Sequence, residues 1–250
     1  MSDFERGYAR SIPPTADMSV DAGLRAFMLG VYNKMALGLL VSAVLAYSVA
    51  NIAPVRDLLY VVNANGALAG YTILGMVLAF APLVLVLVSG FIMKNPSPAA
   101  SGALYWGIVA LIGASGAVWV LRYTGASIAS TFLITATSFG ALSLFGYTTK
   151  RDLQGMGTFL IMGVWGLLIA GLVNMFLQQP MISLIISAAG VLIFAGLTAY
   201  DTQRLKLTYY ELGGDQRAMA VATNYGALSL YLDFINLFQF LLSLLGARRS

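Results

Sequence analysis

Long apolar runs separated by short polar connections dominate the chain. A membrane-spanning helix needs roughly 20 residues at about 1.5 Å of rise per residue. Seven runs have this length, at about 29–52, 70–93, 103–121, 127–147, 156–177, 181–201 and 223–245. The seventh is as long as the others but more polar. This pattern predicts an all-α integral membrane protein with seven transmembrane helices.

The connections carry residues that break helices, and most connections are short, so we expect neighbouring helices to run antiparallel. The breakers include Pro54, Gly66, Pro96, Pro98, Gly125, Gly155, Pro180, Gly213 and Gly214. The first residues are polar and contain Pro13 and Pro14. The expected organisation is a mobile polar tail over residues 1–26 and a transmembrane domain over residues 27–250.

Composition supports the membrane class and narrows the chemistry. Hydrophobic residues make up 59% of the chain and charged residues 10%, against about 25% charged in a typical soluble domain. The chain has no Cys and no His, which excludes imidazole-ligated zinc or haem sites and a histidine proton switch. A pH response near neutrality must therefore come from carboxyl groups. Basic residues are dispersed, so we expect no nucleic-acid partner.

The distribution of Lys and Arg indicates the orientation, because cytoplasmic connections are enriched in these residues. With the N-terminus inside, ten basic residues fall on the inner side and four on the outer side. The outer four are Arg56, Arg122, Arg248 and Arg249. We expect a cytoplasmic N-terminus and, if the seventh run crosses fully, an outer C-terminus. A seventh run that turned back would leave the C-terminus inside.

Two carboxylates lie inside apolar runs, and all the other acids fall in tails or connections. Asp201 closes the sixth run and Asp233 lies within the seventh. A charged group at membrane depth is costly, so such residues are functional candidates by default. We therefore take Asp201 and Asp233 as the candidate site.

Polar residues recur on one face of the seventh run. Tyr225, Ser229, Asp233, Asn236 and Ser243 are spaced by 4, 4, 3 and 7 residues. Lipid would not tolerate such a face, so we expect the seventh helix to be central, surrounded by the other six.

The sixth run has a thinner polar stripe, consisting of Ser183, Ser187, Thr198 and Asp201. The alternative explanation for both stripes is interhelical hydrogen bonding, worth about 0.6 kcal/mol per contact.

Whether the two acids meet depends on the connection between their helices. With one tight turn at Gly213 and Gly214, Asp201 would lie about 10 Å from the depth of Asp233 at the helical rise. If residues 215–222 formed a loop and the last helix began near Thr223, the two depths would match. A paired arrangement thus predicts a loop over these residues.

Two carboxylates in contact cannot both ionise cheaply, so they titrate as a unit. With one proton shared, the pair is a pH sensor. With both groups ionised, it offers hard oxygen ligands that suit Ca²⁺, although Ca²⁺ prefers 6–8 oxygens. Asn236, waters or backbone carbonyls would have to complete the shell. Arg204, Lys34 and Lys94 are the candidate counter-charges, and the sequence does not choose among them.

Two segments carry a family resemblance. Residues 196–206 (Gly-Leu-Thr-Ala-Tyr-Asp-Thr-Gln-Arg-Leu-Lys) and 228–238 (Leu-Ser-Leu-Tyr-Leu-Asp-Phe-Ile-Asn-Leu-Phe) resemble the signature of the Bax inhibitor family, closest to its bacterial branch. The resemblance implies a seven-helix fold, a bacterial inner membrane location and a pH-sensitive calcium leak governed by a di-aspartyl pair, here Asp201 and Asp233. Relatives latch this pair with an arginine in the second helix, but the run 71–93 contains no charge.

Three functions fit these features. The first is a calcium leak channel or transporter gated by protonation of the aspartate pair, without enzymatic activity or a cofactor, and monomeric. The second is a membrane regulator that binds another membrane protein, such as the AAA protease that some bacterial relatives bind. The third is an intramembrane aspartyl protease, which is disfavoured because Asp233 follows Tyr231 and Leu232 and not a Gly-x-Gly sequence.

Overall fold

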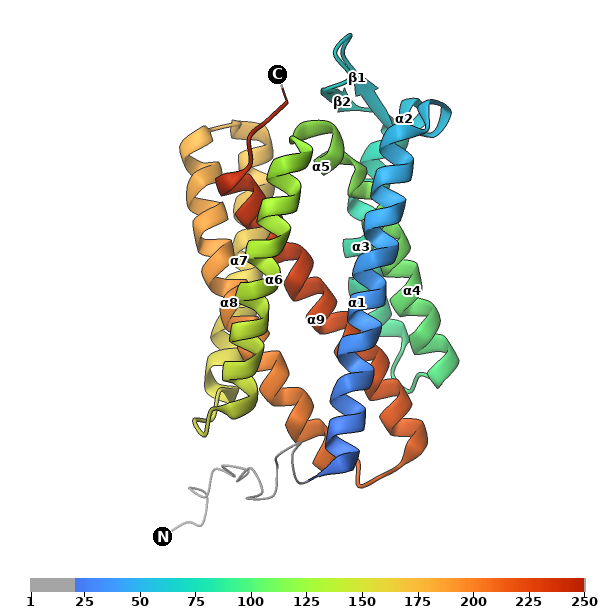
Figure 1. Ribbon diagram of the computed structural model, residues 1–250, viewed down its shortest axis with the longest axis vertical. Coiled ribbons are helices and arrows are strands. Elements are labelled where there is room, and N and C mark those ends of the chain that lie inside the picture. Colours follow the sequence, from blue (N-terminus) through green and yellow to red (C-terminus); the bar gives the residue numbers. More distant parts are fainter. Residues whose placement is uncertain (1–20, 250) are drawn as a thin grey trace.

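The computed structural model describes residues 21–249, and within them seven helices are long and apolar enough to cross a membrane (Figure 1). The predicted all-helical membrane class is confirmed. The elements that form these spans are α1 (Ala22–Asn51), α3 (Ile73–Ile92), α4 (Pro98–Ser115) with its continuation α5 (Ala117–Arg122), α6 (Gly125–Thr148), α7 (Gln154–Leu177), α8 (Pro180–Glu211) and α9 (Gln216–Leu245).

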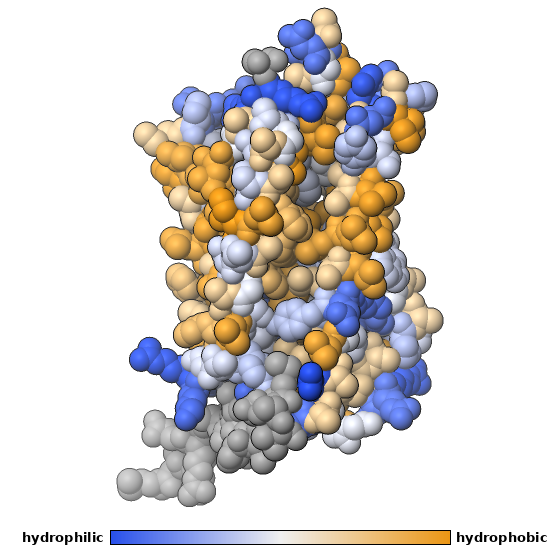
Figure 2. Space-filling model, viewed as in Figure 1, coloured by the Kyte–Doolittle hydropathy of each residue, from blue (hydrophilic) through white to orange (hydrophobic). Residues whose placement is uncertain are grey.

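The surface matches a protein surrounded by lipid. On the face drawn in Figure 2, a broad band of mainly apolar residues crosses the middle of the molecule, with polar residues gathered toward both ends. Large apolar side chains on the peripheral helices are almost fully exposed, including Ile73 and Phe91 of α3 and Phe176 of α7. In water such exposure would be unfavourable, but in a bilayer it places these side chains against acyl chains.

The helix ends follow from their caps. Asp21 precedes α1, and its Oδ1 accepts a hydrogen bond from the backbone N–H of Leu24 at 2.9 Å. The carboxylate of Asp21 also accepts from the hydroxyls of Tyr209 (3.3 Å) and Tyr210 (3.2 Å) at the end of α8. The first helix therefore begins at Ala22, earlier than predicted. Residues 1–20 of the predicted tail lie outside the described residues.

These contacts of Asp21 make its contribution to stability dependent on pH. The hydrogen bond from the Leu24 N–H holds the pKa of Asp21 below its ordinary value. A carboxylate with a depressed folded-state pKa stabilises the protein above its unfolded pKa of about 3.9 and loses that contribution as the pH falls through the folded value. We expect Asp21→Asn to lower the Tm at neutral pH, and the difference from wild type to vanish in strong acid.

Thermal unfolding of the detergent-solubilised protein across this pH range checks the expectation. Asp57→Asn is the matched control, because Asp57 is exposed and forms an ion pair with its sequence neighbour Arg56. Equal Tm values for wild type and Asp21→Asn at neutral pH would contradict it.

The end of the molecule opposite the start of α1 holds a compact cap (Figure 1). It contains α2 (Ala53–Leu59) and an antiparallel hairpin of β1 (Tyr60–Val62) and β2 (Leu68–Tyr71). The chain end returns to the same face, where the N–H of Arg249 donates to the carbonyl of Arg122 at 2.9 Å. The basic residues predicted to lie outside therefore gather at one end.

Helix α9 crosses the bundle obliquely (Figure 1). It packs against α8, α1, α4 and α6, whereas α3 packs mainly on α4 and α7 mainly on α8. Four of the other spans are thus the principal neighbours of the seventh. Helix α9 therefore packs on more of the other spans than α3 or α7 does.

The loop predicted over residues 215–222 is wrong. Helix α8 continues to Glu211, and α9 begins at Gln216, directly after Asp215. The Oδ1 of Asp215 caps α9 by accepting from the N–H groups of Arg217 and Ala218, at 2.9 and 3.1 Å. Gly213 and Gly214 adopt φ of +57° and +87°, which glycine tolerates without steric cost and which make the turn tight.

The depth calculation failed because it assumed upright helices. An oblique helix rises less along the membrane normal per residue than its 1.5 Å axial repeat. Counting residues from the turn therefore overestimated the depth difference between the two acids.

The sixth span is also longer than predicted, and most of the buried residues of α8 lie in its C-terminal half. The expected span ended at residue 201, but the helix runs ten residues further, to Glu211. The buried residues of this half include polar and charged side chains, namely Thr198, Asp201, Thr202, Gln203 and Lys206. Because neighbours lie on several sides, this segment positions the candidate site.

Candidate functional site

The two acids of the apolar runs meet at the contact between α8 and α9. The carboxyl groups of Asp201 and Asp233 lie within hydrogen-bonding reach of each other, so a protonated member can donate to its partner. Both residues are buried, with exposures of 6% and 4%. Among the described residues, Asp233 Oδ2 is the buried side-chain atom left without a hydrogen-bond partner. An unsatisfied buried oxygen is costly, so this pair remains the candidate site.

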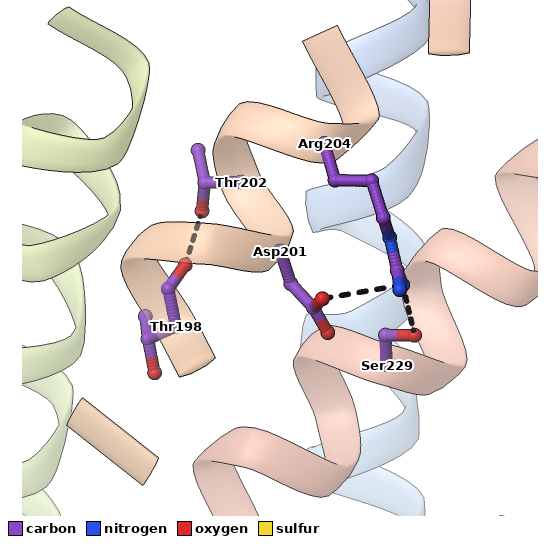
Figure 3. Close-up of polar contacts among 5 residues, drawn as sticks. All are labelled: Thr198, Asp201, Thr202, Arg204 and Ser229. Carbon is purple, nitrogen blue, oxygen red and sulfur yellow. Dashed lines mark hydrogen bonds and ion pairs between the residues drawn. The ribbon is translucent and has the colours of Figure 1, made fainter. Parts of the chain in front are cut away.

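Arg204 supplies a positive charge beside Asp201, one member of the pair (Figure 3). Its Nη2 lies 3.2 Å from Asp201 Oδ1 and donates to Ser229 Oγ of α9 at 3.1 Å. The guanidinium carbon lies 5.6 Å from the ring centroid of Tyr200. The side chain of Arg204 is 44% exposed, so it links the buried pair to the surface. Because Arg204 follows Asp201 by one helical turn, its charge is available without movement of another helix.

The other two candidate cations lie elsewhere. Lys34 of α1 donates to Asn224 Oδ1 of α9, and its Nζ lies 5.2 Å from the ring centroid of Tyr105. Lys94 follows α3, and within residues 21–249 no ion pair joins it to either aspartate. Of the three candidates, the structure therefore brings only Arg204 to the pair.

Of the four predicted supporting residues, one contacts the charged site and the other three bond or pack elsewhere. Ser229 contacts Arg204, whereas Asn236 donates to the carbonyl of Leu232 within its own helix at 2.8 Å. Tyr225 packs against the main core. Thr198 donates to the carbonyl of Phe194, and Figure 3 shows it pointing away from Asp201. Thr198 and Asp201 thus lie one turn apart on α8 but contact different neighbours. Their spacing in the sequence does not reveal this difference.

Three buried polar residues were missed by the sequence reasoning. Gln203 contacts the turn between α6 and α7, and Lys206 donates to the carbonyl of Tyr147 at 3.2 Å. Asn224 donates to the carbonyl of Pro98 and to Ser101 Oγ, at 3.0 and 2.8 Å. The apolar residues Leu205 and Leu207, within two turns of the end of the predicted span, were the available signal that the helix continues into a buried region.

The charges of the site define what it can do. Two ionised carboxylates and one guanidinium leave one net negative charge, and one shared proton brings the sum to zero. The described residues contain no group of three or more carboxylate, His or Cys side chains that could hold a metal ion. The donor set is too small for a resident Ca²⁺, which prefers 6–8 oxygens, but it can contact a passing cation.

The fold and site together define a class, that of polytopic helical membrane proteins with a paired-acid centre between two adjacent spans. Comparison with known proteins supplies the family. Residues 24–250 match the family model described as "Inhibitor of apoptosis-promoting Bax1". The chain belongs to the Bax inhibitor family, as the resemblance of its two aspartate segments implied.

Bacterial relatives match nearly the whole chain. The chain is 66% identical to an uncharacterized protein of Caulobacter vibrioides, with both chains covered in full. It is 41% identical to a protein of Rickettsia prowazekii, over 97% of this chain and 99% of the relative. It is also 41% identical to the inner membrane protein YbhL of Escherichia coli, over 94% of this chain and 98% of the relative.

Proposed function

We propose that this protein is a calcium leak pathway whose opening is set by protonation of Asp201 and Asp233. The observation that carries the proposal is the contact between two buried carboxyl groups with one arginine beside them. Intramembrane acids that face the protein interior mark ion or proton pathways in membrane proteins. Ca²⁺ is the substrate and not a resident cofactor, and no catalytic step is needed.

The mechanism follows from the charge of the site. With one proton shared, the pair and Arg204 are neutral together and attract a cation weakly. When that proton leaves, the site gains a negative charge in a medium of low dielectric, where attraction for a divalent cation is much stronger than in water. A cation that enters competes with Arg204 for Asp201. The number of bound protons therefore sets cation occupancy.

The proposal includes α9 as the central helix and an inner-membrane location with a cytoplasmic N-terminus. Support for the first comes from the four spans that pack on α9 and from its oblique course (Figure 1). Support for the second comes from the Lys and Arg bias of the connections and from the inner membrane location of the Escherichia coli relative.

Flux measurements on the purified protein test the proposal. Ca²⁺ entry into proteoliposomes should depend on pH between about 5 and 8, a range that groups with perturbed pKa values cover. Flux equal to that of protein-free vesicles at every pH would overturn it. Stoichiometric capture of a membrane protein partner in the same preparation would then favour a regulatory role.

Arg204 should set the pH at which flux responds. Without the guanidinium, the pair retains its shared proton to higher pH, since a nearby positive charge favours the ionised carboxylate. We expect Arg204→Gln to move the flux profile toward alkaline pH by about one unit, which corresponds to about 1.4 kcal/mol.

Lys150→Gln is the control for this change, because Lys150 is an exposed cation in the α6–α7 turn. Its profile should coincide with that of wild type. An unshifted profile for Arg204→Gln would exclude Arg204 as the counter-charge.

A further inference from the structure

The backbone directly before α7 is bonded to α8. The capping position of α7 is occupied by Leu153, which has no hydrogen-bonding side chain, and Asp152 Oδ1 accepts from the N–H of Gln154. The backbone N–H of Leu153 itself is bonded by Gln203 of α8, whose Oε1 accepts from it at 2.8 Å. The Nε2 of the same side chain donates to the carbonyl of Arg151, also at 2.8 Å. Gln203 is 2% exposed, so water cannot replace these bonds.

The end of α6 is held against α8 in a similar way. Lys206 donates to the carbonyl of Tyr147, and its Nζ lies 4.5 Å from the Tyr147 ring centroid. A Cβ on Gly146 would come within 2.1 Å of the Ala199 carbonyl oxygen, so the backbones of α6 and α8 are in direct contact. The C-terminal half of α8 is therefore joined to α6 and to the turn before α7 by close backbone packing and by the hydrogen bonds of Gln203 and Lys206.

The contact between α8 and α9 is of a different kind. At the level of the pair it consists of the two aspartates, the Arg204–Ser229 hydrogen bond and the packing of Leu205 on Gly226. Helix α9 is tied to the opposite group of helices through Asn224, which bonds to α1 and α4. The pair thus lies where α8, which is bonded to the α6–α7 turn, meets α9, which is bonded to α1 and α4.

We propose that Gln203 is a positioning residue for the aspartate pair. By bonding the N–H of Leu153 and the carbonyl of Arg151 in the α6–α7 turn, it fixes the rotation of α8 and so holds the Asp201 carboxyl against that of Asp233. The inference deepens the proposed function, since it concerns the same pair. Gln203 carries no charge and does not titrate, so its replacement acts on the pair through geometry alone.

Other groups around this part of α8 also titrate or carry charge, and the Gln203 variants leave them unchanged. They are Asp233 on α9, Arg204 and Lys206 on α8, Tyr147 on α6, Tyr32 on α1, and Lys150, Arg151 and Asp152 in the α6–α7 turn. A comparison between variants that leaves all of them in place isolates the contribution of Gln203.

The test uses the pH dependence of stability, which does not require transport. The Tm of the full-length protein is measured at about pH 5.5 and at about pH 8. Part of the difference between these two Tm values is due to the pair, and we define this component as the part that Asp201→Asn removes. We expect Gln203→Met to remove at least about half of this component, because separated carboxyls no longer titrate as a unit. A purely structural role would lower the Tm equally at both pH values.

Gln239→Met is the matched control, because Gln239 is an exposed glutamine on α9, and it should retain the whole component. Gln203→Asn keeps the amide but is one methylene shorter, so it should give an intermediate value, and it replaces Gln203→Met if that variant does not fold. Hydrogen exchange over residues 151–157 reports whether the Gln203 hydrogen bonds are lost.

The inference is overturned if either Gln203 variant exchanges faster over residues 151–157 yet keeps the full pair-dependent component. Ca²⁺ flux that ignores pH while this component responds to Gln203→Met would instead count against the proposed function and leave the positioning role intact.

Discussion

Replacing Asp233 with Asn is expected to abolish the pH dependence of Ca²⁺ flux. Asn has nearly the same shape but cannot gain or lose a proton, and it removes one of the two carboxyls that share the site. A wild-type flux that changes about tenfold across the transition should change less than about twofold in the variant, since the remaining carboxyl has no second acid with which to share a proton. A Ca²⁺-sensitive dye in proteoliposomes measures the flux of the wild type and of the variant.

Asp201→Asn should give the same flat profile, because the pair titrates as one unit. The matched control is Asp152→Asn, which alters an exposed acid whose Oδ1 caps Gln154, a role that Asn also fills. Its profile should follow that of wild type. Wild-type pH dependence in either Asp201→Asn or Asp233→Asn would separate the pair from gating.

The largest expected loss of stability comes from Gly146→Ala. The added methyl would meet the carbonyl oxygen, carbonyl carbon and Cα of Ala199, all within 2.8 Å, and these are backbone atoms that cannot rotate away. Helices α6 and α8 would have to separate, and overpacking of this kind costs about 3 kcal/mol of the free energy of unfolding. Reversible unfolding in mixed micelles measures the change.

Gly140→Ala on the same helix is the control, because no atom lies within 4 Å of the position that its Cβ would occupy. Alanine is the better helix former, so this variant should be neutral or slightly more stable. Equal stabilities for the two variants would show that α6 and α8 tolerate a wider spacing than the structure has.

The sequence was sufficient for features that depend on local composition. Seven spans follow from the lengths of the apolar runs, and the two acids stand out because carboxylates are rare in such runs. The ion pair between Asp201 and Arg204 could also have been chosen over the lysines, since residues three apart on a helix are neighbours.

Features that depend on the relative tilt of helices could not be predicted in this way. The oblique course of α9 brings Asp233 to Asp201 despite the tight turn, whereas residue counting required a loop before Thr223. The hydrogen bond between Gln203 and Leu153 joins segments 50 residues apart, and nothing in either segment indicates its partner.

The most direct test of the central claim is a count of protons. The sequence contains no His, so titration of the tag-free protein between about pH 5 and about pH 8 reports carboxyl groups with little background. Wild type should bind about one proton more over this range than the double variant Asp201→Asn, Asp233→Asn, because the pair shares one proton. Identical proton uptake by the two proteins would contradict a shared proton and the gating built on it.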